Sequence, residues 1–168
     1  ISLKAGDRVV AASSSRDSDH LVFITSDAQL LHFQADAVRP QGRSAGGMAG
    51  IRLSSSAQVI TFTAVQPGLT NVVATVAGSL GQLAGVGAST IKTSDFAEFP
   101  AKGRGTGGVR CHRLTKGEDA LLLAWAGKAP VRAETAAGRP IAVPTELKAR
   151  DGAGDKIKTT IAAIGGSH

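Results

Sequence analysis

Residues that could cross-link the chain or carry redox chemistry are almost missing. Its 168 residues include one cysteine, one methionine, one tryptophan and no tyrosine. A single cysteine excludes an internal disulfide and a zinc site built from spaced cysteine pairs, and it fits a reducing compartment such as the cytoplasm. We expect Cys111 to be a small core residue, and we expect no metal and no cofactor in this chain.

Long apolar runs are missing as well. No run approaches the about 20 residues that a membrane helix needs, so we expect no membrane partner. The N-terminal residues ISLK show no signal-peptide pattern and no initiator methionine, and we expect a piece cut from a longer protein. A glycine loop followed by Gly-Lys-Ser or Gly-Lys-Thr is also missing, which excludes the common phosphate-cradling ATP loop.

Glycine and basic residues are abundant instead. The 21 glycines and 6 prolines suit many short strands and tight turns better than long helices. Lysine and arginine number 19 against 13 acidic residues, which gives a net charge of +6. Such a surface attracts polyanions such as nucleic acid, although a soluble cationic domain would have the same charge. Aromatic residues make up only 4%, so stacking platforms for single strands are lacking and duplex backbone contact fits better.

Two twelve-residue segments are near copies of each other. They are GRSAGGMAGIRL at 42–53 and GRGTGGVRCHRL at 103–114, here called motif one and motif two. Both read Gly-Arg-x-x-Gly-Gly-apolar-x-x-x-Arg-Leu, and the first arginines, Arg43 and Arg104, are 61 residues apart. An interval of this size predicts a repeat architecture, with glycines that allow positive φ or a close backbone approach.

Short apolar runs accompany the motifs. Runs at 21–27, 72–78 and 121–127 follow polar residues and end in turn signals, which is typical of buried strands entering hairpins. The third unit retains only a weak echo of the motif, RDGAG at 150–154, as terminal repeats often do. We also expect strands at 30–33, 58–63 and 89–92, a glycine-rich excursion at 78–87 and one helical turn near 95–99.

Two apparent catalytic motifs fail when they are compared with their copies. GRSAG at 42–46 has the Gly-x-Ser-x-Gly pattern of a hydrolase, but the copy replaces Ser44 by Gly105. GRGTGG at 103–108 has a dinucleotide-binding pattern, but it leads into a strand-like segment and its copy lacks the pattern. A hydrolase built on Ser44 is kept as a remote third hypothesis, to be dismissed by absent esterase activity.

The basic residues near the repeats are the candidate site. Arginine and lysine beside glycine turns are well placed for phosphates, although Arg43 and Arg104 could equally brace one blade against the next, and the others could be solvated surface. Joint charge reversal at Arg104, Arg110 and Arg113 should weaken binding to any duplex. The candidate DNA-binding residues are Arg43, Arg52, Lys92, Lys102, Arg104, Arg110, Arg113, Lys116, Lys128 and Arg132.

Motifs one and two resemble the repeat of the C-terminal domain of bacterial type IIA topoisomerase A subunits, those of gyrase and topoisomerase IV. The family pattern is Gly-Arg-x-Ala-x-Gly-Val-x-Gly-Ile-x-Leu, from which motif two departs at Thr106, Cys111 and Arg113. The resemblance implies an all-β β-pinwheel, a propeller-like ring of four-stranded blades that exchange strands. This chain offers about three such blades, with approximate bounds 1–53, 54–114 and 115–168 in a single repeat domain, as an open or truncated ring.

Within this family we favour topoisomerase IV over gyrase. Gyrase A domains carry a Gln-Arg-Arg-Gly-Gly-Lys-Gly box for DNA wrapping, and the nearest segment, QGRSAGG at 41–47, lacks the arginine pair and the lysine. The third unit, with KGED at 116–119 and RDGAG at 150–154, is more similar to actinobacterial topoisomerase IV subunits. A gyrase wrapping domain stays the alternative within the family.

The resemblance also implies what this chain does and does not do. The family cleaves DNA with a tyrosine in another domain, and this chain has no tyrosine, so it is not an enzyme by itself. It would bind and bend duplex DNA and present it to the cleavage core for ATP-dependent strand passage, with ATP and Mg²⁺ used elsewhere. The implied partners are duplex DNA, the remainder of the A subunit, and the ATPase B subunit of an A2B2 holoenzyme, in the bacterial cytoplasm at the nucleoid. The isolated domain would be a monomer.

The alternative from another class is a protein-interaction or structural propeller. A gel shift with random duplex would distinguish this alternative from a DNA-binding domain.

Overall fold

The protein is all-β, as expected. The structure, a computed structural model, describes residues 2–81 and 89–166, so most of the glycine-rich excursion expected at 78–87 lies outside the described residues. Two one-turn 3-10 helices, η1 (Ala35–Ala37) and η2 (Phe96–Glu98), follow β2 and β5, and η2 confirms the single helical turn expected there. The strands are β1 (His20–Thr25), β2 (Gln29–Gln34), β3 (Val59–Val65), β4 (Asn71–Gly78), β5 (Ser89–Asp95), β6 (Val109–Arg110), β7 (Ala120–Lys128), β8 (Arg132–Glu134), β9 (Pro140–Ile141), β10 (Asp155–Ile157) and β11 (Ala163–Gly165).

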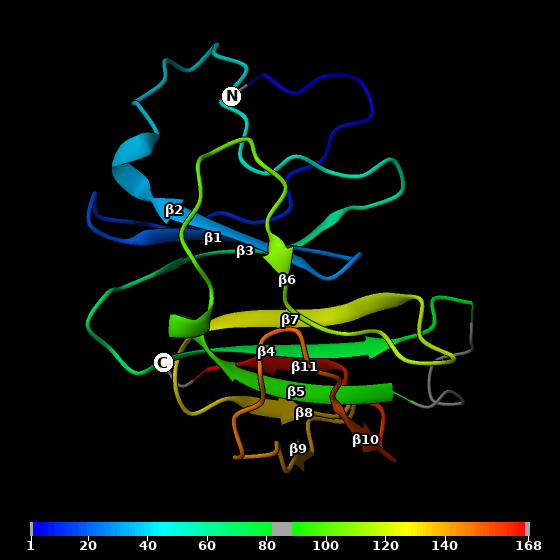
Figure 1. Cartoon of the computed structure of the whole chain (residues 1–168). Helices are drawn as coiled ribbons and strands as arrows, with labels where there is room; N and C mark the ends of the chain where they lie inside the picture. Colours follow the sequence, from blue (N-terminus) through cyan, green and yellow to red (C-terminus); the bar gives the residue numbers. More distant parts are fainter. Residues whose placement is uncertain (1, 82–88, 167–168) are drawn as a thin grey trace.

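The strands form three antiparallel sheets that follow one another through the molecule (Figure 1). The first has the order β3-β1-β2-β6, the second β7-β4-β5-β10 and the third β11-β8-β9. Each sheet is built on a hairpin, and a later strand covers one edge of that hairpin. In the first two sheets the other edge is covered by a short strand that comes directly after a glycine turn of the next repeat, so neighbouring repeats exchange strands.

Strand exchange changes the expected blade bounds. The boundaries 1–53 and 54–114 do not describe the sheets, because β3 and β6 both belong to the first sheet. The run at 121–127 is a strand, but it does not begin a third hairpin. It lies in β7, which pairs with β4 and completes the second sheet. In the described residues the third sheet has three strands, not four.

The third hairpin is recognisable from its turn. In the first hairpin the Thr25 hydroxyl accepts a hydrogen bond from the Gln29 N–H at 3.1 Å, and Ala28 has a φ of 61°. In the third hairpin the Thr135 hydroxyl accepts from the Arg139 N–H at 3.1 Å, and the residue at positive φ is Gly138. The same side-chain-to-backbone bond therefore closes both turns. Pro140 follows the third turn as Leu30 follows the first.

Apolar side chains fill the spaces between the sheets. Buried residues such as Val22, Leu30, Val73 and Leu121 form one cluster between the first and second sheets, and Cys111 lies fully buried within it, as expected. A second cluster, which includes Ile91, Ala133 and Ile161, lies between the second and third sheets. In residues 2–81 and 89–166 no helix is long and apolar enough to span a membrane.

Glycine is required where the exchanged strands dock. A Cβ built on Gly108, just before β6, would lie 2.4 Å from the carbonyl oxygen of Leu30 on β2. A Cβ on Gly154, just before β10, would lie 2.8 Å from the carbonyl oxygen of Ile91 on β5. Since Leu30 and Ile91 are 61 residues apart, the two glycines have the same role in successive sheets. The weak echo at 150–154 is therefore the third copy of the motif turn.

Candidate nucleic-acid interface

Successive motifs contact each other through a fixed set of backbone bonds. The Arg52 N–H of motif one donates to the Thr106 carbonyl of motif two at 3.0 Å, and the Gly105 N–H donates to the Gly50 carbonyl. The Arg104 guanidinium donates to the Ala49 carbonyl at 3.0 Å. This contact, here called the first seam, shows Arg104 bracing motif two against motif one, which was one of its two expected roles.

The second seam repeats this arrangement between motif two and the turn at 149–152. The Arg113 N–H donates to the Gly152 carbonyl at 3.0 Å, and the Arg150 guanidinium lies 3.4 Å from the Arg110 carbonyl, in the position that Arg104 has in the first seam. The N-terminal segment uses the same bond again, from the Ser2 N–H to the Ala45 carbonyl at 3.2 Å. The motif turns therefore stack on one another along one side of the molecule.

Three arginines meet at the second seam. Arg110, Arg113 and Arg150, with Asp151 and Gly152, line an open hollow in the surface. Glu98 of η2 approaches from the side and accepts a hydrogen bond from the Arg150 backbone N–H at 2.8 Å. Three guanidinium groups against two carboxylates leave the seam with an excess of positive charge. Planar guanidinium groups are suited to gripping phosphate oxygens.

Arg150 is the site residue that sequence reasoning missed. Its turn was recognised only as a weak echo, because GRGTGG of motif two has become ARDGAG at 149–154. The signal that could have found Arg150 is the spacing to the docking glycine. Arg104 lies four residues before Gly108, and Arg150 lies four residues before Gly154.

Lys92 is a correction to the predicted site. It is only 1% exposed, and its ammonium donates to the carbonyls of Ala149, Arg150 and Gly152 within the protein. Burial lowers the Lys92 pKa to about 8, because an ammonium loses its water there. A side chain enclosed in this way has no free donor for a phosphate outside.

A buried polar chain lies beside Lys92. His112 is 1% exposed and its two ring nitrogens lie 2.8 Å from the Thr75 hydroxyl and 3.2 Å from the Thr90 hydroxyl. Thr90 donates in turn to the Glu118 carboxylate at 2.6 Å. Burial, reinforced by the positive charge of Lys92, lowers the His112 pKa to about 4. The imidazole is therefore neutral at physiological pH and serves as a satisfied structural group.

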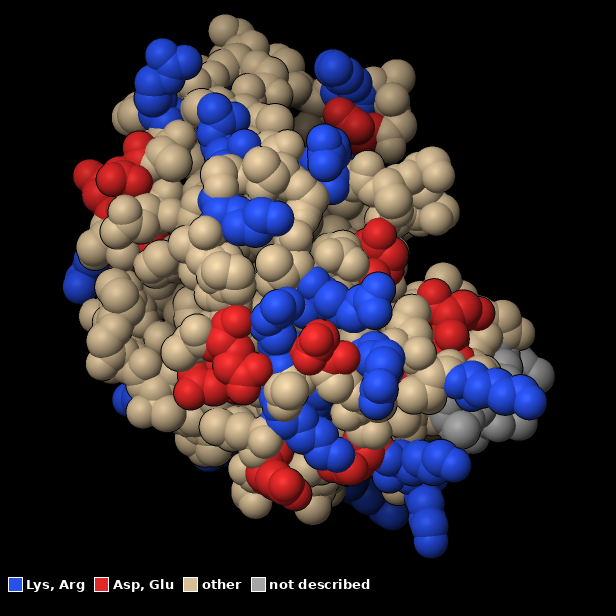
Figure 2. Space-filling model, in the orientation of Figure 1, with Lys and Arg blue, Asp and Glu red and all other residues tan. Residues whose placement is uncertain are grey.

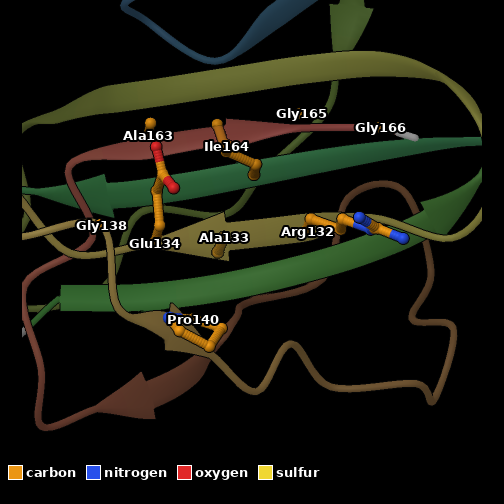
Figure 3. Close-up of a pocket in the computed structure, with 9 residues that line it drawn as sticks. All are labelled: Arg132, Ala133, Glu134, Gly138, Pro140, Ala163, Ile164, Gly165 and Gly166. Atoms are coloured by element: carbon orange, nitrogen blue, oxygen red, sulfur yellow. The ribbon is translucent and has the colours of Figure 1, made fainter. Parts of the chain in front are cut away.

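The other predicted residues are exposed but dispersed. Lys102 donates to the Gly108 carbonyl at 3.2 Å and so lies beside the docking glycine of motif two. Arg43 and Arg52 are exposed on motif one, Lys116 is exposed in the turn before β7, and Lys128 is exposed at the end of β7. Arg132 lines a different hollow, over the third sheet, where it lies on β8 and points away from Glu134 (Figure 3). Small residues such as Ala163 and Gly165 line most of that hollow, which gives it little means of holding a polyanion.

The distribution of charge agrees with an extended basic face. Figure 2 shows lysine and arginine side chains over the side of the molecule that runs from the first sheet to the third, interspersed with fewer acidic side chains. Within the described ranges, no group of three or more His, Cys, Asp or Glu residues could hold a metal ion. The arginines that line the hollow at the second seam are suited to binding anions.

Comparisons with known proteins agree with this architecture. Residues 19–66 and 90–122 match the family model described as DNA gyrase C-terminal domain, beta-propeller. A topoisomerase subunit of Mycolicibacterium smegmatis, TopoM, is 32% identical over 106 residues, which are 62% of this chain and 14% of that protein. The gyrase A protein of Deinococcus deserti is 33% identical over 110 residues, which are 65% of this chain and 13% of that protein. The chain thus spans a small fraction of these relatives.

Solved structures show the same fold. A gyrase A C-terminal domain matches 98% of this chain with a TM-score of 0.76 at 13% identity, and the match covers 56% of that structure. A topoisomerase IV C-terminal domain matches 88% of this chain with a TM-score of 0.69 at 15% identity, and the match covers 46% of that structure. The solved structures therefore show that this chain has the β-propeller fold of the gyrase A and topoisomerase IV C-terminal domains. The family model and the relatives show that its sequence is similar to the same A-type subunits.

Proposed function

We propose that this domain binds and bends duplex DNA along its stacked motif turns and presents the DNA to the cleavage core of a type IIA topoisomerase. The observation that carries the proposal is the second seam, where strand exchange brings Arg110, Arg113 and Arg150 into one exposed hollow. Backbone phosphates are the groups that such arginines bind in most protein–DNA contacts. Binding by phosphate contacts would be weakly selective for sequence and strongly dependent on salt.

The role of the seam is tested by removing its charge. We expect the triple variant Arg110→Gln, Arg113→Gln, Arg150→Gln to lose affinity for random duplexes uniformly across sequences. The slope of log K against log salt should become shallower by about 0.9 for each phosphate that the variant no longer binds, so by about 2 to 3 in total. Fluorescence anisotropy with a labelled duplex, titrated at several salt concentrations, measures both quantities.

The matched control removes the same charge elsewhere. Arg16, Arg39 and Arg139 are exposed and lie outside both seams, so their replacement by glutamine lowers the net charge equally. We expect this control to change affinity much less and to leave the salt slope within about 0.5 of the wild-type value. Equal losses in the two triple variants would show that net charge, and not the seam, governs binding.

The holoenzyme context follows from the same proposal. The domain would act within an A2B2 assembly with the ATPase subunit, in the bacterial cytoplasm. We retain topoisomerase IV as the preferred branch on the sequence argument above, and the relatives include proteins named for both gyrase and topoisomerase subunits. Ligation of a nicked circle in the presence of the domain separates the branches, because a gyrase wrapping domain would leave the closed circle supercoiled with one preferred hand.

A further inference from the structure

Lys92 stands where the first sheet has leucine. Leu31 on β2 and Lys92 on β5 are 61 residues apart, and each follows the residue against which the docking glycine packs. Both side chains are 1% exposed. The scaffold therefore accommodates an apolar side chain at this place, and a buried lysine is not needed to form the sheet. Since an apolar residue would avoid the desolvation that lowers the Lys92 pKa, the lysine requires another explanation.

The two motif turns hold the equivalent carbonyl group with different donors. In the turn at 103–106, the Thr106 hydroxyl donates to the Gly103 carbonyl at 2.7 Å and closes the turn from within. In the turn at 149–152, glycine replaces that threonine, and Gly152 has no hydroxyl to donate. There the Lys92 ammonium donates to the corresponding carbonyl, that of Ala149, at 3.0 Å. It also donates to the carbonyls of Arg150 and Gly152.

The turn held by Lys92 carries the third arginine of the second seam. We propose that Lys92 is a positioning residue for DNA binding: its buried ammonium fixes the turn at 149–152 and thereby keeps the Arg150 guanidinium beside Arg110 and Arg113. Lys92 itself contacts no DNA in this arrangement and acts through Arg150. The inference rests on the proposed function, because it assigns the turn a role in holding phosphate.

The inference is tested by giving Lys92 the residue that the first sheet has at the equivalent position, leucine. We expect Lys92→Leu to fold with an unchanged circular dichroism spectrum, since Leu31 has the same place in the first sheet. Loss of the ammonium should speed hydrogen exchange at the Gly152 and Arg113 amides about tenfold, because both amides bond within or onto the turn. Duplex affinity should fall about three- to tenfold at fixed salt, with the salt slope shallower by about one phosphate contact.

A rescue variant separates positioning from charge. Lys92→Leu combined with Gly152→Thr restores the hydroxyl of motif two and has the same net charge as Lys92→Leu alone. We expect the double variant to recover most of the affinity and the slow amide exchange. In an Arg150→Ala background, Lys92→Leu should cause no further loss of affinity, because the residue through which it acts is gone.

The outcomes distinguish the inference from the proposed function. If the wild-type domain binds duplex in a salt-dependent manner but Lys92→Leu binds equally well, the positioning role is overturned and the proposed function stands. The positioning role is also overturned if Lys92→Leu weakens binding equally with and without Arg150. If the wild-type domain does not bind duplex DNA, the proposed function fails and this inference fails with it.

Discussion

Single positions in this repeat have exchanged apolar for polar residues without losing the fold. Position 51 in motif one is isoleucine, and the same position in motif two is His112, which is buried between the hydroxyls of Thr75 and Thr90. The exchange succeeds because the second hairpin supplies hydroxyl partners for both ring nitrogens. A buried polar group costs the most stability when its hydrogen bonds are not made, and the two hydroxyls supply the bonds that the imidazole needs. The pair Leu31 and Lys92 follows the same rule with backbone carbonyls as the partners.

The burial of His112 predicts a pH dependence of stability. Its pKa is about 4 in the folded protein and near 6.5 when unfolded, so between these values the unfolded chain binds more protons. The contribution of His112 is therefore complete above pH 6.5 and is lost as the pH falls towards 4, by up to about 3 kcal/mol. Urea unfolding between pH 4.5 and 7.5 measures this loss. His112→Gln keeps hydrogen bonding without titrating and should flatten the profile, whereas parallel profiles of wild type and variant would contradict the assignment.

At the scale of elements, the sequence predicted strands better than it predicted their partners. The apolar runs correctly predicted β1, β4 and β7, because a short apolar run indicates a buried strand. They misassigned β7, since a run of leucines does not show which sheet will receive it. β8 and β9 escaped notice, because three residues that read Arg-Ala-Glu and two that begin with proline make no periodic pattern.

The candidate site shows the same division between local and long-range information. The exposed arginines of motif two could be named from the repeat. The burial of Lys92 could not, because its partners lie in a turn 57 residues further along the chain. Arg150 was overlooked for the related reason that its turn is recognised by docking against β5 and only weakly by its residues.

Docking of the exchanged strands predicts the most sensitive glycine. Gly108→Ala places a Cβ against the backbone of Leu30, where no side-chain movement can relieve the clash. We expect a loss of about 2 kcal/mol in the free energy of unfolding and partial release of β6 from the first sheet. Gly46→Ala in motif one is the matched control, because its Cβ would meet nothing within 4 Å and its φ is not positive. Chemical denaturation of the two variants gives the comparison, and equal stabilities would mean that β6 does not dock as closely as the structure shows.

At the scale of the whole molecule, the exchanged strands and the basic residues both depend on the motif turns. The short strands that tie one sheet to the next start from the motif turns, so the same turns that join the blades carry basic residues at regular steps on the surface. Three sheets place two seams in succession, and the matched parts of the solved C-terminal domains have the same fold. A DNA duplex that follows the turns would contact the protein through the DNA phosphate backbone at each seam.

If the domain binds DNA as proposed, this geometry predicts a preference for duplex over single strands. The large exposed apolar side chains in residues 2–81 and 89–166 are leucines and valines, so in that part of the chain no exposed aromatic ring offers a stacking platform. Binding should therefore depend on paired phosphate rows, with a slope of log K against log salt near −4 to −5 if about 4 to 6 phosphates are neutralised. Unlabelled duplex should displace a labelled duplex at several-fold lower nucleotide concentration than a single strand of the same sequence does. Preference for the single strand, or a slope near zero, would mean that the domain recognises bases or a protein partner, because neither result can arise from arginines arranged along a phosphate backbone.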